Sequence, residues 1–258
     1  MPTKPRRRII PPLLWLTLLL AAFFIFWELM AQLGRIDLIF FSSPSRIWRE
    51  FLSMLETGLL HRHLSVTLQE AGGGLFYGSV FGSAAGILLG ISKRISPVIM
   101  PLIVGLNSVP KLALAPLLIL WFGIGIGSKV LIAGLMVFFI FTFNLYAGYH
   151  SVDASLIQTV RLLGGNRRQL IRLVIWPSCL PWFLASLRTG MGLALSGAIV
   201  GEFIGASRGL GWLINDAGGR YDLTRVLCCV LVIIVIMMAL DALVRLLERT
   251  LLKWRPEA

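Results

Sequence analysis

Residues 66–91 read VTLQEAGGGLFYGSVFGSAAGILLGI, a predominantly apolar run that is long enough to cross a bilayer. Glycine recurs in it at every fourth position, at Gly74, Gly78, Gly82, Gly86 and Gly90. On a helix this spacing forms one ridge, which lets a neighbouring backbone approach closely in lipid. The run therefore predicts a membrane helix whose glycine face packs within the chain. A subunit interface and a sliding surface are the alternatives for this face.

The whole chain has the composition of an integral membrane protein. Of its 258 residues, 57% are hydrophobic and 14% are charged, whereas about 25% are charged in soluble domains. The mean hydropathy is +0.85. An aqueous fold of this size could not bury so much apolar surface, and disordered chains carry far less of it. These numbers exclude a soluble domain and a disordered chain.

Apolar runs of spanning length recur along the chain and leave no room for a second domain. We predict one all-α membrane domain over 1–258 with six transmembrane helices. The first run follows Lys4, Arg6, Arg7 and Arg8, as a signal peptide would, but it continues past Trp27 without a cleavage motif, which favours a retained helix. The six predicted spans are 13–33, 66–91, 98–122, 130–149, 180–204 and 226–247.

The net charge of +12 is distributed between the spans and does not form a patch. We therefore expect no nucleic-acid partner. Fourteen Lys and Arg residues fall on the side of both termini and eight on the other side. This asymmetry predicts cytoplasmic N- and C-termini, with anionic lipid headgroups as partners of the basic residues.

Residues 43–60 have the pattern of an amphipathic helix. Ser43 can cap its start and Pro44 suits its first position. We predict a helix that lies on the outer membrane surface. Its apolar face is formed by Ile47, Phe51, Met54 and Leu55.

The run 98–122 is interrupted by prolines and polar residues. Proline frees backbone carbonyls, which is tolerated in a membrane where the chain faces protein or a water-filled cavity. We therefore place this run near a permeation path. A structural kink, with Lys111 reaching the interface, is an equal alternative. The residues concerned are Pro101, Pro110 and Pro116, with Asn107, Ser108 and Lys111.

No catalytic set and no metal site are predicted. The chain has no Gly-Lys pair, and so it has no Walker A loop for ATP phosphates. Residues 205–209 match G-x-S-x-G formally, but they follow a membrane helix and lack an acid–histidine pair. We place His61 and His63 in a solvated loop. They have no neighbouring carboxylate or cysteine that could complete a metal site.

Ionisable residues within membrane spans are candidates for function. Arg188 and Glu202 share one span but lie about 21 Å apart along a helix. Each therefore needs a partner on another helix or in water. The candidates are Glu28, Lys111, Arg188, Glu202 and Asp241.

Residues 155–177 read SLIQTVRLLGGNRRQLIRLVIWP and carry the most specific pattern. The pattern predicts a short helix, a glycine turn, a second basic helix and a proline stop. An apolar and basic helix pair on the cytoplasmic face suits docking of another protein.

This segment resembles the E-A-A-x(3)-G-x(9)-I-x-L-P loop of binding-protein-dependent ABC importer permeases. Gly164, Val174 and Pro177 stand at the glycine, isoleucine and proline positions of the family. Gln158, Thr159 and Val160 replace the E-A-A residues, and Trp176 replaces the leucine. Further segments are similar to the nitrate/sulfonate/taurine/bicarbonate subfamily, namely 109–117, 119–125, 43–45, 200–202 and 209–211.

The resemblance implies a type I importer permease in the bacterial inner membrane, without a cofactor of its own. Its partners would be a second permease copy in a homodimer, two ATP-binding subunits that hold ATP and Mg, and an external solute-binding protein. The segment 153–177 would be the coupling loop, and ATP-driven closure of the ATPases would turn the permeases from inward-facing to outward-facing. The coupling residues would be Gln158, Arg161, Gly164, Arg167, Arg168 and Pro177.

The solute would be a small anion such as an organic sulfonate or taurine. Riboflavin and a thiamine pyrimidine precursor are alternatives. The alternative classes are an ion-coupled secondary transporter and a membrane-embedded enzyme. The residues expected near the solute path are Asn107, Ser108, Lys111 and Glu202.

Overall fold

The computed structural model describes residues 12–252, and every regular element in that range is a helix. Six of the basic residues that predict cytoplasmic termini lie outside the described residues: Lys4, Arg6, Arg7, Arg8, Lys253 and Arg255. The helices in chain order are α1 (Pro12–Gln32), α2 (Leu38–Phe41), α3 (Pro44–Glu56), α4 (Leu59–Ile91), α5 (Ser96–Ser108), α6 (Lys111–Phe122), α7 (Ile126–His150), α8 (Ala154–Leu162), α9 (Arg167–Leu170), the π-helix η1 (Ile171–Ile175), α10 (Trp176–Gly205), α11 (Leu210–Gly219) and α12 (Leu223–Leu251).

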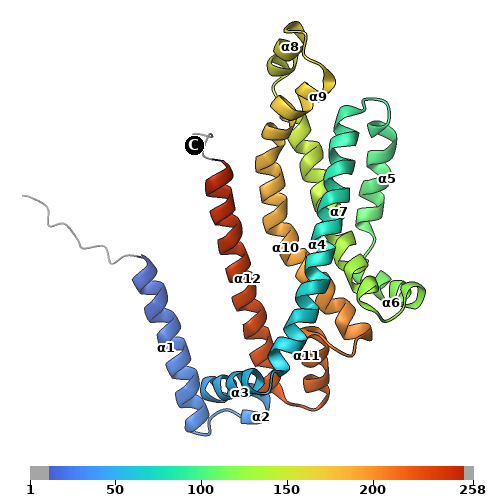
Figure 1. Cartoon of the computed structure of the whole chain (residues 1–258). Coiled ribbons are helices and arrows are strands. Elements are labelled where there is room, and N and C mark those ends of the chain that lie inside the picture. The colour runs from blue at the N-terminus through green and yellow to red at the C-terminus, as the bar shows by residue number, and fades with distance from the viewer. Residues whose placement is uncertain (1–11, 253–258) are drawn as a thin grey trace, which may run out of the picture.

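Within residues 12–252, five helical segments are long and apolar enough to cross a membrane, and the bent pair α5–α6 adds a sixth as a broken span. The long helices α4, α7, α10 and α12 run roughly side by side, whereas α1 stands apart from them and contacts α3 (Figure 1). Helices α8 and α9 lie beyond one end of them, and α2, α3 and α11 lie at the other end. The number of predicted spans is therefore confirmed. The bounds of the helices differ from the predicted ones, and the run 98–122 is bent between α5 and α6.

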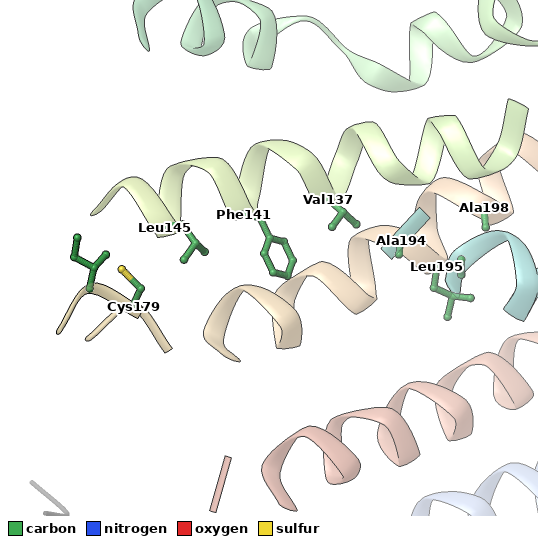
Figure 2. Packing of buried hydrophobic residues seen from close by; sticks show 9 residues of the cluster. Val137, Phe141, Leu145, Cys179, Ala194, Leu195 and Ala198 are labelled. Carbon is green, nitrogen blue, oxygen red and sulfur yellow. The ribbon is translucent and has the colours of Figure 1, made fainter. Parts of the chain in front are cut away.

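The core is formed by α4, α7 and α10, which pack on one another. Apolar side chains from α7 and α10 interdigitate in it (Figure 2). A second cluster joins α3, α11 and α12. The labelled core residues in Figure 2 are Val137, Phe141, Leu145, Cys179, Ala194, Leu195 and Ala198.

The glycine ridge of α4 is the surface that meets α7. A Cβ atom on Gly78 would lie 2.6 Å from the carbonyl oxygen of Gly134, and one on Gly82 would lie 2.5 Å from that of Phe138. Gly74, Gly86 and Gly90 meet α7 in the same way. The absence of side chains thus brings the two backbones into direct contact, as small residues do between membrane helices.

The run 98–122 is not one straight helix. Helices α5 and α6 meet at an angle of 89°. Val109 is extended at φ −68° and ψ 129°, and Pro110 follows it as the N-cap of α6. The residue before a proline is driven out of the helical region, so the break falls here. Pro101 and Pro116 lie inside α5 and α6.

The predicted proline stop is wrong. Pro177 lies in the first turn of α10, and the chain is helical from Arg167 to Gly205. The π-helix directly before it accounts for this, because the N–H of Trp176 donates to the carbonyl of Ile171, five residues back. A wider π turn accommodates a proline that would disrupt regular α-helical bonding.

The surface helix begins as predicted but is shorter. The hydroxyl of Ser43 accepts a hydrogen bond from the N–H of Arg46, and the helix ends at Glu56. Gly58, at φ +69°, then turns the chain into α4. Of the predicted apolar face, Ile47 and Met54 are buried, whereas Leu55 is 48% exposed.

Helix α4 begins at Leu59, seven residues before the predicted span. The prediction of a solvated loop at His61 and His63 is therefore wrong, and His63 is buried. Lys129, which we counted among loop residues, is also buried, in the first turn of α7. The added length at these two helix ends brings polar side chains into the protein interior.

Candidate functional site

The segment 153–177 is organised by local caps. The carboxylate of Asp153 accepts the N–H of Ser155 at 2.8 Å and starts α8. This backbone hydrogen bond holds the pKa of Asp153 below its usual value. Asn166 and Gln169 form a reciprocal capping box that starts α9, with hydrogen bonds of 2.9 and 2.8 Å.

Two glycines join α8 to α9. Gly164 has φ +75°, a conformation that favours glycine. Its N–H donates to the carbonyl of Arg161 at 3.0 Å, and the N–H of Gly165 donates to Val160 at 2.8 Å. A Cβ on Gly165 would lie 2.5 Å from Val160 Cγ1. The turn therefore favours glycine at 164 through its φ and leaves no room for a side chain at 165.

The turn presents two apolar side chains that the sequence reading did not single out. Leu162 and Leu163 are 88% and 82% exposed, directly before Gly164. The candidate coupling residues Gln158, Arg161, Gly164, Arg167 and Arg168 are also exposed, and Pro177 is half-buried. The segment thus offers apolar side chains with a basic surround at one end of the molecule (Figure 1).

The break between α5 and α6 brings together two of the predicted path residues. Lys111 Nζ donates to both the carbonyl oxygen and Oδ1 of Asn107 at 2.7 Å. It also lies 4.9 Å from the centre of the Phe139 ring. Ser108 instead donates to the carbonyl of Val104. Glu202 does not join this group.

Glu202 lies near the end of α10 and is 1% exposed. Its Oε1 accepts the hydroxyl of Thr67 at 2.6 Å, and its Oε2 accepts the N–H of Gly211 at 2.5 Å. The hydroxyl of Thr67 in turn accepts the N–H of Leu210 at 2.8 Å. The expected partner on another helix is therefore Thr67 of α4, and the carboxylate joins α4, α10 and α11.

The surrounding glycines are required by the Glu202 side chain. Gly209 has φ +115°, and a Cβ there would lie 2.2 Å from the Glu202 carboxyl carbon. A Cβ on Gly211 would lie 2.8 Å from Glu202 Oε2. A Cβ on Gly201 would lie 2.8 Å from Lys129 Cγ. The Val200-Gly201-Glu202 and Gly209-Leu210-Gly211 segments are thus two sides of one packed site.

His63 completes the contact between α4 and the turn before α11. Its Nδ1 lies 3.0 Å from the carbonyl oxygen of Gly209 and 3.1 Å from the Gly209 nitrogen. Its ring stacks on Trp212 at 5.3 Å between centroids, with an angle of 6° between planes. The imidazole therefore fixes the turn and does not face solvent.

Glu70 and Lys129 bring further charge to the same interior. Each is 2% exposed. Glu70 lies beside the carboxyl of Glu202, and its Oε2 has no hydrogen-bond partner among the described residues. Lys129 Nζ donates to the carbonyl oxygens of Ile124 and Gly125. Both side chains line a cavity of about 260 Å³, which Arg208 also borders.

Sequence reasoning missed His63, Thr67, Glu70 and Lys129. A signal for the first three was present, because His63, Thr67 and Glu70 are spaced i, i+4 and i+7 and so share one helix face. This face continues into the glycine ridge. The stripe that packs on α7 therefore becomes polar toward the start of α4.

A continuous helical rod separates the segment 153–177 from the Glu202 site. The chain is helical from Arg167 to Gly205, so Glu202 lies about 50 Å along the rod from Arg167. The other ionisable residue of this rod, Arg188, pairs with Asp241 of α12 at 2.7 Å. In residues 12–252, no group of three His, Cys, Asp or Glu side chains is placed to hold a metal ion.

Comparison with known proteins gives these sites a context. Residues 78–253 match the family described as binding-protein-dependent transport system inner membrane component. The chain is 37% identical to the riboflavin transport system permease protein RibX of Chloroflexus aurantiacus, over 94% of this chain and 91% of that protein. It is 36% identical to the putative aliphatic sulfonates transport permease protein SsuC of Bacillus subtilis, over 92% and 86%.

Solved structures agree on the fold. A chain of the MetNI methionine ABC transporter in an inward-facing conformation superposes with a TM-score of 0.64 at 18% identity, over 75% of this chain and 95% of that one. The relatives are transport permeases and not enzymes. The chain therefore belongs to the binding-protein-dependent transport system inner membrane components, as a membrane-embedded permease subunit of an ABC importer for a small solute.

Proposed function

We propose that two copies of this permease form the solute path and that an ATP-binding subunit docks on the segment 153–177 of each copy. An external solute-binding protein delivers the solute to the opposite face. ATP and Mg are held by the ATP-binding subunits. ATP-driven approach of these subunits moves the two permeases from inward-facing to outward-facing, and hydrolysis returns them.

The observation that carries the docking site is the exposure of Leu162 and Leu163, at 88% and 82%. Leu162 ends α8 and Leu163 caps it, next to the turn that Gly164 shapes, and α8 lies beyond the ends of the long helices (Figure 1). Large apolar side chains in such a position favour burial against a partner protein. The neighbouring Gln158 and Arg168 supply polar contacts around these two leucines.

The helical rod from Arg167 to Gly205 supports a direct mechanical link. A force on α9 acts on the same continuous helix that ends at Glu202. There, hydrogen bonds to Thr67 and Gly211 attach α10 to α4 and α11. Movement of the docking segment is thus transmitted to the opposite end without a flexible joint.

We assign both termini to the cytoplasm. The chain enters α1 and leaves α12 at the ends of those helices that point toward the α8–α9 end (Figure 1). The side with more Lys and Arg is the cytoplasmic side. A common side for the termini and the docking segment agrees with this rule.

The solute in this proposal is a small organic sulfonate such as taurine. The similarity to the aliphatic sulfonates permease supports this class. The ammonium group of Lys111 at the α5–α6 break favours an anion, and Asn107 holds it in place. Riboflavin, named for the other relative, and a thiamine pyrimidine precursor are the competing solutes.

The docking site is tested by purification of the complex. The Leu162→Ala/Leu163→Ala double variant should lose the ATP-binding subunit during affinity purification, while the permease still inserts in the membrane. Leu120→Ala is the matched control, since Leu120 is 79% exposed on α6, away from the docking segment. Retention of the ATP-binding subunit by the double variant would show that docking occurs elsewhere.

The solute and the energy source are tested together in proteoliposomes that contain the complete complex. Uptake of labelled taurine, riboflavin and an aminopyrimidine is measured with ATP and with sodium or proton gradients. We expect ATP-dependent taurine uptake without need of a gradient. ATP-dependent uptake of riboflavin alone would replace the proposed solute, and gradient-driven uptake without ATP would replace the importer mechanism.

A further inference from the structure

A second cavity, of about 570 Å³, lies at the α8–α9 end of the molecule. It is open on one side and is lined by the connection between α4 and α5, the end of α7 and the segment from α8 to η1. These parts are far apart in the sequence. The lining residues are Ile91, Ser92, Lys93, Arg94, Tyr149, Arg161, Gly165, Asn166, Arg167, Leu170, Ile171 and Ile175.

The more exposed part of the lining, here called the rim, is strongly basic. Lys93 and Arg94 come from the α4–α5 connection, and Arg161 and Arg167 come from the two sides of the glycine turn. No Asp or Glu lines the cavity. The ion pairs found in residues 12–252 involve other basic side chains: Arg188, Arg220, Arg225 and Arg245. The four charges at the rim therefore lack acidic compensation within the described chain.

The less exposed part of the lining, here called the floor, is mostly apolar. Leu170, Ile171 and Ile175 line it from the start of the α10 rod, and Ile91 lines it from the end of α4. Tyr149 adds an aromatic ring from the last turn of α7. A basic rim above an apolar floor fits a ligand that carries a phosphate group next to an apolar part.

The position of the cavity indicates that such a ligand comes from the membrane. Helices α4 and α7 are membrane-spanning candidates, and they end at Ile91 and His150, at the cavity. The cavity therefore lies at the boundary between the apolar span and water, the depth of lipid headgroups. Basic pockets between membrane helices at this depth are suited to anionic headgroups.

We propose that this cavity binds the phosphate headgroup of an anionic phospholipid from the leaflet on the α8–α9 side. Lys93, Arg94, Arg161 and Arg167 contact the phosphate, and the apolar floor takes the adjoining glycerol and acyl carbons. The bound lipid bridges the α4–α5 connection and the docking segment, which otherwise repel each other. Arg161 and Arg167 of the docking segment thus contact the lipid. Arg168 and Arg172 of the same segment do not line the cavity.

The test uses the full-length permease in detergent, with phosphatidylglycerol and phosphatidylcholine as probes. Binding is measured by native mass spectrometry as a function of lipid concentration. The wild-type chain should prefer phosphatidylglycerol. Lys93→Gln/Arg94→Gln should raise the Kd for phosphatidylglycerol about tenfold or more and leave the Kd for phosphatidylcholine within about twofold.

Arg172→Gln/Arg249→Gln is the matched control. It removes the same charge from exposed residues outside the cavity, and its Kd for phosphatidylglycerol should stay within about twofold of wild type. The thermal unfolding of all variants in detergent without added lipid checks that they are folded. Equal loss of binding in both double variants would overturn the site in favour of general charge attraction, as would undiminished binding by Lys93→Gln/Arg94→Gln.

Two further measurements test whether the cavity binds inorganic phosphate or the ATP-binding subunit instead of a lipid. If inorganic phosphate at millimolar concentration displaces phosphatidylglycerol from the wild-type chain, the site takes a free anion and the lipid assignment is wrong. If the ATP-binding subunit displaces the lipid on assembly, the basic rim is a protein-docking surface and the proposal is overturned. Retention of phosphatidylglycerol in the assembled complex supports it. These readouts do not depend on transport, so they are independent of the proposed solute.

Discussion

The hydroxyl group of Thr67 donates a 2.6 Å hydrogen bond to Oε1 of Glu202, 135 residues further along the chain. Oγ1 of Thr67 in turn accepts the N–H of Leu210 at 2.8 Å. One threonine on α4 therefore holds both the end of α10 and the start of α11. This relationship places α4, which also forms the glycine contact with α7, at the centre of the fold.

Thr67→Val removes this hydroxyl while keeping the shape of the side chain. We expect a loss of about 1–3 kcal/mol in the free energy of unfolding, because the Leu210 N–H and one Glu202 oxygen lose a partner in a buried site. Thermal unfolding in detergent measures the effect. Thr67→Ser, which retains the hydroxyl, is the control and should stay closer to wild type. Equal stability of Thr67→Val and wild type would show that the hydrogen bonds contribute nothing.

Gly209→Ala is predicted to be the most damaging single-methyl change at this site. Its φ of +115° disfavours any side chain, and its Cβ would lie 2.2 Å from the carboxyl carbon of Glu202. We expect a loss of about 3 kcal/mol or more and poor recovery of monodisperse protein. Gly72→Ala is the matched control, since a Cβ there meets no atom within 4 Å. Size-exclusion profiles of the two variants compare them directly.

Gly82→Ala tests the ridge between α4 and α7. The added Cβ would lie 2.5 Å from the Phe138 carbonyl oxygen and 2.8 Å from Phe141 Cβ. The helices must move apart, which should lower the free energy of unfolding by about 1–3 kcal/mol. Gly105→Ala on α5 meets no atom within 4 Å and should not destabilise the protein. A stable Gly82→Ala protein would indicate that α4 and α7 can separate without cost.

Hydrophobic runs predicted most of this fold because a membrane helix must satisfy its backbone internally and expose apolar side chains. The spacing of the glycines also indicated the packed face of α4. The start of α4 was missed because His61, Arg62 and His63 read as a polar loop. In the structure His63 is covered by the 209–212 segment, and a contact of such long range leaves no local pattern in the sequence.

The effects of individual prolines could not be told from the sequence alone. Pro101, Pro110 and Pro116 occur in one run, yet the chain breaks only at Pro110, where the preceding Val109 is extended. Pro177 is accommodated by a preceding π-helix that no composition signal marks. Whether a proline breaks the helix depends in each case on the hydrogen bonds that the neighbouring backbone carbonyls make.

The candidate sites were predictable to different degrees. A glycine turn was predicted between two short helices, and Gly164 forms one at φ +75°. Glu202 was singled out as an ionisable residue in a span. Its neighbour Glu70 met the same criterion within the predicted span 66–91 but was overlooked, and Lys129 falls one residue before the predicted span 130–149. Their proximity arises from the packing of three helices.

Lys111→Ala tests the expected solute path. Removal of the ammonium group frees Asn107 and removes positive charge from the α5–α6 break. In proteoliposomes with the complete complex, we expect taurine uptake to fall about tenfold or more while ATP hydrolysis continues. Lys111→Arg retains the charge and should keep more of the uptake. Unchanged uptake by Lys111→Ala would remove this residue from the path.

Gly164→Pro tests the coupling role of the turn. Proline fixes φ near −65° and has no N–H, whereas Gly164 has φ +75° and donates to the Arg161 carbonyl. The turn between α8 and α9 must therefore reshape, and Leu162 and Leu163 must be displaced with it. We expect normal membrane insertion, loss of the ATP-binding subunit on purification and at least about a tenfold fall in ATP-driven uptake.

Gly164→Asn is the control for this change, because asparagine tolerates the left-handed conformation and keeps the N–H. No atom lies within 4 Å of a Cβ at this position, so the new side chain has space. It should co-purify with the ATP-binding subunit and retain most of the uptake. A Gly164→Pro permease that still binds the subunit and is driven by it would show that coupling uses another part of the α8–α9 end, since the turn could then change shape without consequence.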